Sequence, residues 1–170
     1  LSPMHEKLVR AAALTHQATG LTIVSHTGGD GPALAQLQIL QEMGVSPGAF
    51  VWTHAQGGTL EGYLEAANRG AWISLDHVNA GENGQGGNLD WYVQTLAALK
   101  AAGVLDHILL SHDAGWYNAG QENGGYFRPY TDLFTHLIPQ LKASGFTQAD
   151  LDLLLVDNPR RAYALGVRQR

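Results

Sequence analysis

The sequence predicts an α/β fold with a central parallel β-sheet. Four short apolar runs each end in hydroxyl, imidazole or carboxylate side chains, and each is followed by an amphipathic helical pattern. Continuous apolar runs of this length are typical of strands covered on both faces. Successive strand–helix units connect through right-handed crossovers. We therefore expect four parallel strands whose C-terminal ends meet at one edge of the sheet.

The first part of the chain contains a leading helix and two strand–helix units. Ser2-Pro3 is typical of an N-cap followed by a first helical position, and Gly20 is placed to end that helix. We expect strands over 21–25 and 49–53. Leucines at helical spacing follow each of these strands, and each helical pattern ends at a glycine.

The other two units have longer connections. We expect strands over 71–75 and 108–111. A glycine-rich loop over 80–88 follows the first of them and precedes an apolar helical pattern that begins at Leu89 and stops at Gly103.

The last part of the chain is predicted to be a long loop followed by three helices. The loop covers 114–129, and an apolar helical stripe over 130–141 follows it. Pro139 lies inside that stripe and predicts a kink. Residues 147–150 resemble a capping box, and Asn158-Pro159 is typical of the cap and first turn of a separate last helix.

Composition limits the classes of partner. The chain has 170 residues, enough for one domain with a sizeable core, and its net charge is -5 with no run of lysine or arginine. We therefore expect a small-molecule ligand and neither a nucleic-acid nor a membrane partner. Cysteine is absent, which excludes disulfides and thiolate metal sites. A soluble protein, cytoplasmic or exported, agrees with this composition.

Imidazole and carboxylate groups at the strand ends predict a metal site. His26, His54 and Asp113 occupy equivalent positions just after three strands, and such groups bind zinc, manganese, iron or cobalt. Alternatively, each side chain caps a strand end and bonds backbone groups. His112 precedes Asp113 and, by strand alternation, should face the opposite side in a structural role.

Other side chains near the strand ends are candidates for substrate contact. One of Asp76 and His77 should face the centre of the edge, and His77 is either a contact to substrate or leaving group or a structural histidine. Trp116, Tyr117, Tyr126 and Phe127 interrupt the long loop. These aromatic residues could wall an apolar substrate pocket, pack the loop down, or form a subunit interface.

The pattern alone allows either a doubly wound open sheet or half of a (βα)8 barrel. A lone half-barrel would leave two bare strand edges and would need a partner.

The chain also resembles the C-terminal half of proteins of the phosphotriesterase family. This family of metal-dependent amidohydrolases includes phosphotriester hydrolases and lactonases. The motifs that carry the resemblance run nearly end to end: Ser2-Pro3, Ser25-His26-Thr27, Gly44-Val45-Ser46-Pro47, Thr53-His54, Ile73-Ser74-Leu75-Asp76-His77, 108–113 and Asn158-Pro159-Arg160-Arg161. The resemblance implies strands 5 to 8 of a (βα)8 TIM barrel.

The resemblance further implies a binuclear metal centre. Two divalent ions, most often Zn²⁺ but also Mn²⁺, Co²⁺ or Fe²⁺, are bridged in this family by a carboxylated lysine and a hydroxide. His26 and His54 match the ligands of the more exposed ion. Asp113 matches the aspartate that binds the buried ion. In the family this aspartate also takes the proton from the bridging hydroxide as the hydroxide attacks phosphorus or a carbonyl carbon.

The rest of that centre is expected on a segment upstream of Leu1. The family's His-x-His pair and bridging lysine belong to the first half of the barrel, so we expect residues 1–170 to be the second half of one barrel domain. The missing N-terminal half-barrel would be the partner, and the resemblance also implies a homodimer.

One residue departs from the family pattern and affects the predicted substrate. Many members have an acidic residue three positions after the second metal-binding histidine, where this chain has Gly57. A proton relay from Asp113 must then run through His77 or water, or be absent. We expect a hydrolase of esters or lactones, with phosphotriesters as the alternative. A non-catalytic binding protein on a decayed barrel and a mononuclear iron or zinc enzyme are the competing hypotheses.

Overall fold

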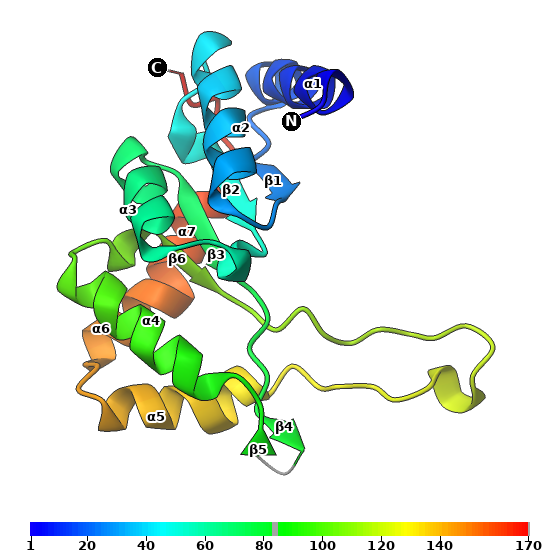
Figure 1. Ribbon diagram of the computed structural model, residues 1–170, viewed down its shortest axis with the longest axis vertical. Coiled ribbons are helices and arrows are strands. Elements are labelled where there is room, and N and C mark those ends of the chain that lie inside the picture. Colours follow the sequence, from blue (N-terminus) through cyan, green and yellow to red (C-terminus); the bar gives the residue numbers. More distant parts are fainter. Residues whose placement is uncertain (83–84, 170) are drawn as a thin grey trace.

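The computed structural model describes residues 1–82 and 85–169 and confirms the predicted α/β fold (Figure 1). Four parallel strands form one sheet in the order β1-β2-β3-β6. They are β1 (Ile23–His26), β2 (Phe50–Thr53), β3 (Trp72–Leu75) and β6 (Ile108–Leu110). All four strands run in the same direction, so their C-terminal ends lie at one edge of the sheet.

The leading helix and the helices of the first three strand–helix units also follow the prediction. They are α1 (Pro3–Thr19), α2 (Asp30–Glu42), α3 (Leu60–Arg69) and α4 (Leu89–Ala101). Ser2 and His5 form a capping box at the start of α1, and Gly20, at φ 73°, ends that helix in the left-handed region. Short 3₁₀ turns precede or follow the strands: Pro47–Ala49, Ala55–Gly57, Leu105–His107 and Glu122–Gly124.

The main core lies between the sheet and its helices. Its largest fully buried side chains include Trp52, Tyr63, Tyr92, Leu37, Leu96 and Ile73. A smaller cluster contains Val51, Trp72, Leu109 and Ala162. Burial of a large apolar side chain in the main core contributes roughly 1.5–3 kcal/mol to the free energy of unfolding. No helix in the described ranges is long and apolar enough to cross a bilayer.

The predicted loop over 80–88 contains a small hairpin that the sequence did not predict. Strand β4 (Gly81–Glu82) pairs antiparallel with β5 (Gln85–Gly86), while residues 83 and 84 lie outside the described residues. The backbone N–H of Ala80 donates to Oδ2 of Asp132 at 3.0 Å, which fixes the start of this loop. Two-residue strands carry too little pattern to be recognised from sequence.

Pro139 lies where a π-helical segment joins an α-helix, a change of helix type that the sequence did not predict. A π-helical segment, Leu133–Leu137, runs directly into α5 (Ile138–Ala143), which contains Pro139. In an ordinary α-helix the proline ring would clash with the carbonyl group four residues earlier. The wider π turn accommodates the ring, so the helix continues through the proline.

The prediction that a separate last helix begins at Asn158 is wrong. Helix α6 (Gln148–Asp152) continues through a π segment, Leu153–Asp157, into α7 (Asn158–Tyr163). Asn158 has helical φ and ψ of -62° and -51° and is not an N-cap. Its side chain is buried and donates to the carbonyl oxygens of Leu105 and Ile108 at 2.9 and 2.8 Å, so it joins this helix to β6.

The capping box at the start of α6 is confirmed, and its Asp150 gives a stability prediction. Oδ2 of Asp150 accepts from Lys100 Nζ and from the backbone N–H and hydroxyl of Thr147, each at 2.7 Å. The hydrogen bond from Lys100, followed by those from Thr147, lowers the pKa of Asp150 to about 2. The ionised form is therefore favoured in the folded state.

Asp150→Asn should lower the free energy of unfolding by about 1 kcal/mol at pH 7. Because the folded-state pKa is lowered, this stabilisation is present above pH 4 and is lost as the pH falls from about 4 to about 2. Urea unfolding of the protein measures the effect. Asp152→Asn, which loses only one exposed contact to Gln148, is the matched control. An equal effect of the two variants would contradict the prediction.

Candidate active site

Side chains with acid–base and metal-binding chemistry gather at the C-terminal ends of the four parallel strands. We call this region the reactive edge; it carries His26, His54, His77 and Asp113. His26 is the last residue of β1 and His54 directly follows β2. Because the two strands are neighbours in register, the two imidazole rings meet edge to face with centroids 4.2 Å apart.

Asp76 orients His54 across the sheet. One carboxylate oxygen of Asp76 contacts Nδ1 of His54 at 2.7 Å, and the other accepts from the backbone N–H of His54 at 2.9 Å. Ser74 and Gln56 also donate to this carboxylate, at 2.9 and 3.2 Å, and Asp76 is only 4% exposed. A carboxylate on Nδ1 leaves Nε2 as the free nitrogen, as is usual for a histidine that binds a metal.

Asp76 was missed as a functional residue by sequence reasoning, which left open whether it or His77 faces the edge. The structure shows that Asp76 is buried against His54, whereas the side chain of His77 is 51% exposed. The alternation of strand residues was the available signal, but it could not show which strand Asp76 contacts.

The backbone at the reactive edge is strained at two of the predicted residues. His54 has φ 56° and Asp113 has φ 45°, and among the described residues Asn123 alone joins them as a non-glycine residue with positive φ. Such conformations cost about 1–3 kcal/mol and persist only where surrounding contacts hold them, most often at active sites. This strain supports a functional role for both side chains.

His77 and Asp113 are neighbours, whereas His112 is not part of the edge. Nδ1 of His77 lies 4.0 Å from Oδ2 of Asp113. His112 is buried and its Nε2 accepts from the backbone N–H of Leu133 at 3.0 Å. Burial lowers the pKa of His112, which favours its neutral form. The predicted structural role of His112 is confirmed.

The predicted ligands are only partly brought together. His26 and His54 are adjacent, but across 1–82 and 85–169 no group of three or more His, Cys, Asp or Glu side chains is arranged to hold a metal ion. The donor chemistry fits a metal at the histidine pair, because His54 presents Nε2 and is fixed from behind by Asp76. The metal-binding roles of His26, His54 and Asp113 stay predictions.

An open cavity of about 430 Å³ lies beside the edge. Its lining includes His54, Gln56, His77, Asn88 and Trp91. Asn88 and Trp91, at the start of α4, were missed because their helical pattern carried no sign that this turn faces the strand ends. The cavity combines one aromatic wall with two amide side chains and the two imidazoles, which suits a small substrate with both apolar and polar parts.

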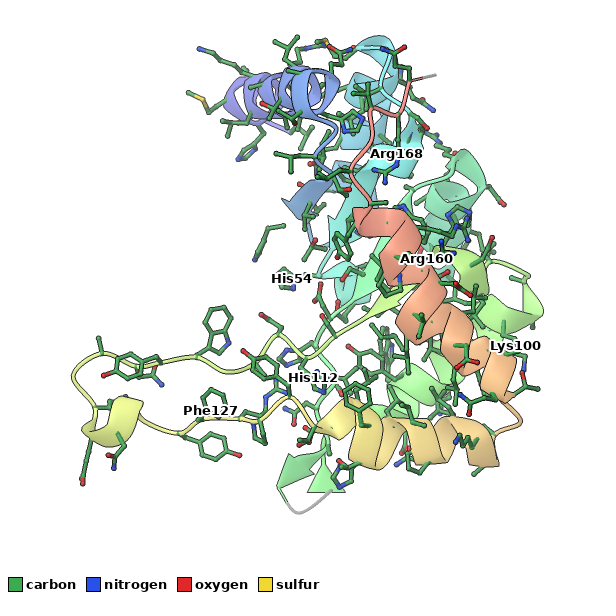
Figure 2. All side chains as sticks on the ribbon, turned by 180° about the vertical axis from the view of Figure 1, so that it is seen from behind. His54, Lys100, His112, Phe127, Arg160 and Arg168 are labelled. Atoms are coloured by element: carbon green, nitrogen blue, oxygen red, sulfur yellow. The ribbon has the colours of Figure 1, made fainter. Side chains whose placement is uncertain are left out.

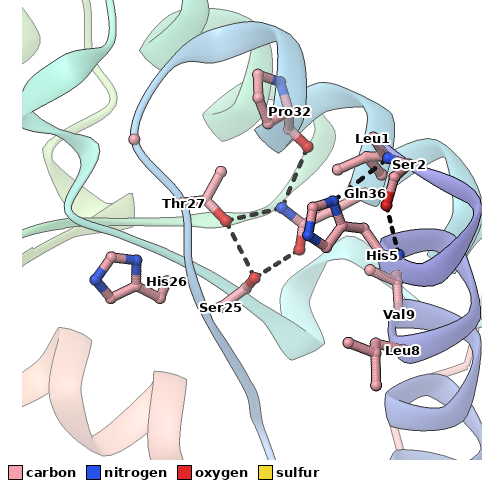
Figure 3. A pocket seen from close by; sticks show the side chains of 11 residues that line it. Leu1, Ser2, His5, Leu8, Val9, Ser25, His26, Thr27, Pro32 and Gln36 are labelled. Atoms are coloured by element: carbon pink, nitrogen blue, oxygen red, sulfur yellow. Dashed lines mark hydrogen bonds between the residues drawn. The ribbon is translucent and has the colours of Figure 1, made fainter.

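A second cavity, of about 490 Å³, lies between α1 and β1 with His26 at its margin (Figure 3). The amide of Gln36 bonds the hydroxyls of Ser25 and Thr27, the residues on either side of His26. Gln36 is 5% exposed. These contacts hold the end of β1 and therefore the position of His26.

The long loop after β6 extends away from the body of the molecule (Figure 1). We call residues 114–130 the arm. Trp116, Tyr117 and Tyr126 are 66%, 77% and 81% exposed, so these aromatic residues do not pack the loop down. Figure 2 shows rings along both limbs of the arm. None of the three belongs to the lining of the cavity at His54 and His77, and their predicted role in substrate binding stays a prediction.

Gly57 is closely packed against the loop that follows β1. A Cβ atom at Gly57 would lie 3.2 Å from the carbonyl carbon of Gly28, which is tighter than an ordinary contact. Any side chain at this position, acidic or not, would require the two turns to separate by a few tenths of an ångström.

The sheet and its helices have the architecture of half of a (βα)8 barrel, with reactive side chains at the carboxyl ends of the strands. The model of the phosphotriesterase family matches residues 1–163, and the chain belongs to this family.

Three relatives illustrate the similarity. The chain is 35% identical to the phosphotriesterase homology protein of Escherichia coli over 169 residues, covering 96% of this chain and 54% of that protein. The crystal structure of that protein, with phosphate in its active site, has a TM-score of 0.77 and covers 94% of this chain and 53% of its own. The aryldialkylphosphatase of Saccharolobus solfataricus is 28% identical, with coverages of 94% and 52%.

A lactonase structure from Listeria monocytogenes is 24% identical, with a TM-score of 0.80 and coverages of 98% and 51%, and shows the shared fold. The chain spans about half the length of the curated relatives it matches.

Proposed function

We propose that the chain contributes half of the active site of a metal-dependent hydrolase. The observation that carries the proposal is the pair of strained residues, His54 and Asp113, at one sheet edge, with His54 fixed by the buried Asp76. Family membership supports hydrolysis, since its members include proteins named as a phosphatase and a lactonase.

The metal centre of this proposal is binuclear. His26 and His54 would hold one divalent ion and Asp113 the other, with Zn²⁺ the first candidate and Mn²⁺, Co²⁺ or Fe²⁺ the alternatives. The remaining ligands, including a carboxylated lysine, would come from an N-terminal half-barrel. When bound, the ions would lower the pKa of a coordinated water and polarise the bond to be cleaved.

The residues of this chain would bind substrate and move the proton. Asp113 would accept a proton from the attacking water. Nδ1 of His77 lies 4.0 Å from that carboxylate, beyond hydrogen-bond length, so a bridging water would carry the proton to His77 or directly to solvent. His77 also lines the cavity in which the acyl part of the substrate would lie against Trp91. Trp116, Tyr117 and Tyr126, exposed on the arm, are the further candidates for contact with the substrate.

Esters or lactones are the favoured substrates. A relay from Asp113 would run through His77 or water and has no acidic continuation at Gly57, where an added Cβ atom would lie 3.2 Å from the carbonyl carbon of Gly28. Phosphotriesters are the alternative, supported by the similarity to an aryldialkylphosphatase.

Metal analysis and a panel of aryl esters, lactones and dialkyl aryl phosphates test this function on the full protein that contains this chain. Two metal ions per chain with turnover of an ester or lactone would support it. One metal ion per chain would favour the mononuclear alternative. If the protein bound no metal and turned over no substrate, the non-catalytic binding protein would be the remaining hypothesis. Intact mass and light scattering test the proposed companion half-barrel and homodimer; an active chain of 170 residues alone would exclude the former.

Asp76→Asn should weaken metal binding about 10- to 100-fold, because the amide group would face the donating N–H of His54 and no longer fix its ring. Titration of the metal-free full protein with Zn²⁺ measures the change. Asp90→Asn, on the exposed face of α4, is the matched control. Unchanged affinity in Asp76→Asn would show that this carboxylate does not orient a metal ligand.

A further inference from the structure

Arg128 lies where the arm returns to the body, and its guanidinium donates hydrogen bonds to three backbone carbonyl groups. Nη2 donates to the carbonyl oxygens of His112 at 2.6 Å and Asp113 at 2.9 Å. Nη1 donates to the carbonyl oxygen of Val78 at 2.8 Å. The side chain of Arg128 is only 18% exposed.

These three carbonyl groups belong to the extensions of two different strands. Val78 follows β3, and His112 and Asp113 follow β6. Beyond the strand ends, the parallel ladder no longer supplies donors for all of these groups. A planar guanidinium carries five N–H donors in a fixed fork and can join carbonyls on both segments, whereas the three donors of a lysine radiate from one atom.

The same contact bears on the strained residue. Asp113 has φ 45°, a conformation that persists only where neighbouring groups hold it, and Arg128 bonds the carbonyl group of this residue and of the one before it. Arg128 is itself held by Asp132, 3.9 Å from Nη1, which also accepts from the backbone N–H of Ala80.

We propose that Arg128 is a positioning residue that holds Asp113, and the segment carrying His77, in the geometry of the reactive edge. The inference rests on the proposed hydrolase function, in which Asp113 takes the proton. Arg128 acts through the backbone of Asp113 and does not touch substrate. It also couples the base of the arm to the site, so that the arm and the proton acceptor keep a fixed relation.

The test uses Arg128→Met, Arg128→Lys and the control Arg160→Met in the full protein. The side chain of Arg160 is 71% exposed, and within 1–82 and 85–169 its hydrogen-bond partner is Asp157 at 3.2 Å. Hydrogen–deuterium exchange is followed for peptides covering 76–80 and 111–116. Turnover of the fastest ester or lactone gives kcat and KM per folded molecule.

Arg128→Met should raise exchange in both peptides about tenfold and lower kcat about 10²-fold with KM nearly unchanged, since small displacements of a catalytic group cost that much. Arg128→Lys should show smaller changes in both the exchange and kcat than Arg128→Met. Arg160→Met should match the parent protein in both measurements. Unchanged exchange in Arg128→Met, or an unchanged kcat per folded molecule, would overturn the inference.

If the parent protein turns over no substrate, the proposed function fails, and exchange alone still decides whether Arg128 holds the two segments. If Arg128→Met does not fold, the same two measurements on Arg128→Lys decide.

Discussion

Asp113→Asn should lower kcat by about 10³-fold or more while the fold stays intact. An amide cannot take the proton from the attacking water, and loss of a positioned general base typically costs 10²- to 10⁴-fold. Asparagine matches aspartate in shape and tolerates positive φ, so the strained backbone at φ 45° can be kept. Steady-state kinetics measure the loss of kcat, and thermal unfolding of the protein checks that the fold is intact.

Asp106→Asn is the control for this substitution. Asp106 lies at the opposite end of β6, its side chain is 45% exposed, and its nearest charged neighbour is Arg161 at 4.0 Å. It should keep the parent rate. Full activity in Asp113→Asn would exclude this carboxylate as the proton acceptor, whereas a large loss of stability would show that its main role is structural.

Trp52→Ala should lower the free energy of unfolding by about 3–5 kcal/mol, the usual cost of removing a buried tryptophan. Trp52 is fully buried in the core and packs against Tyr63 at a ring distance of 5.5 Å. Its Nε1 donates to the carbonyl oxygens of Thr27 and Gly28 at 2.8 and 3.1 Å. The side chain therefore also fixes the loop that follows His26.

Trp52→Phe separates the two contributions. It keeps most of the apolar contact but leaves the two carbonyl groups without their donor, which should cost about 1–3 kcal/mol. Trp91→Ala, at a position 37% exposed, is the matched control and should change stability much less. Chemical denaturation measures all three variants. A loss in Trp52→Ala no greater than in Trp91→Ala would contradict this account of the core.

Apolar periodicity was sufficient to predict the strands and the first four helices, because each segment buries one continuous face. The prediction failed at Asn158, where local sequence favours a helix start. There the π segment before Pro159 removes the steric reason for a break, and the buried carbonyl groups of Leu105 and Ile108 supply partners for the amide. Contacts between residues about fifty positions apart leave no periodic pattern in a sequence.

The same limit applies to the candidate site. The position of His26 and His54 at strand ends followed from parallel topology, and their contact is confirmed. The contact of Asp76 with His54 depends on which strands are neighbours and on a positive φ at His54. Arg128 lies in a loop without any regular pattern, and only the folded chain shows that it reaches Val78 and Asp113.

The open arm has a consequence for how this fold can change in evolution. Its tip is closed by its own hydrogen bonds, such as that from Asn118 N to the carbonyl oxygen of Gly124 at 2.8 Å, and its limbs bury little surface. Lengthening a loop twofold costs only about 0.6 kcal/mol of closure entropy. Insertions, deletions and new side chains between Gly115 and Phe127 can therefore accumulate at little cost in stability, except at the glycines with positive φ in this segment. The arm is a segment in which substrate preference can diverge while the strand ends and their chemistry stay the same.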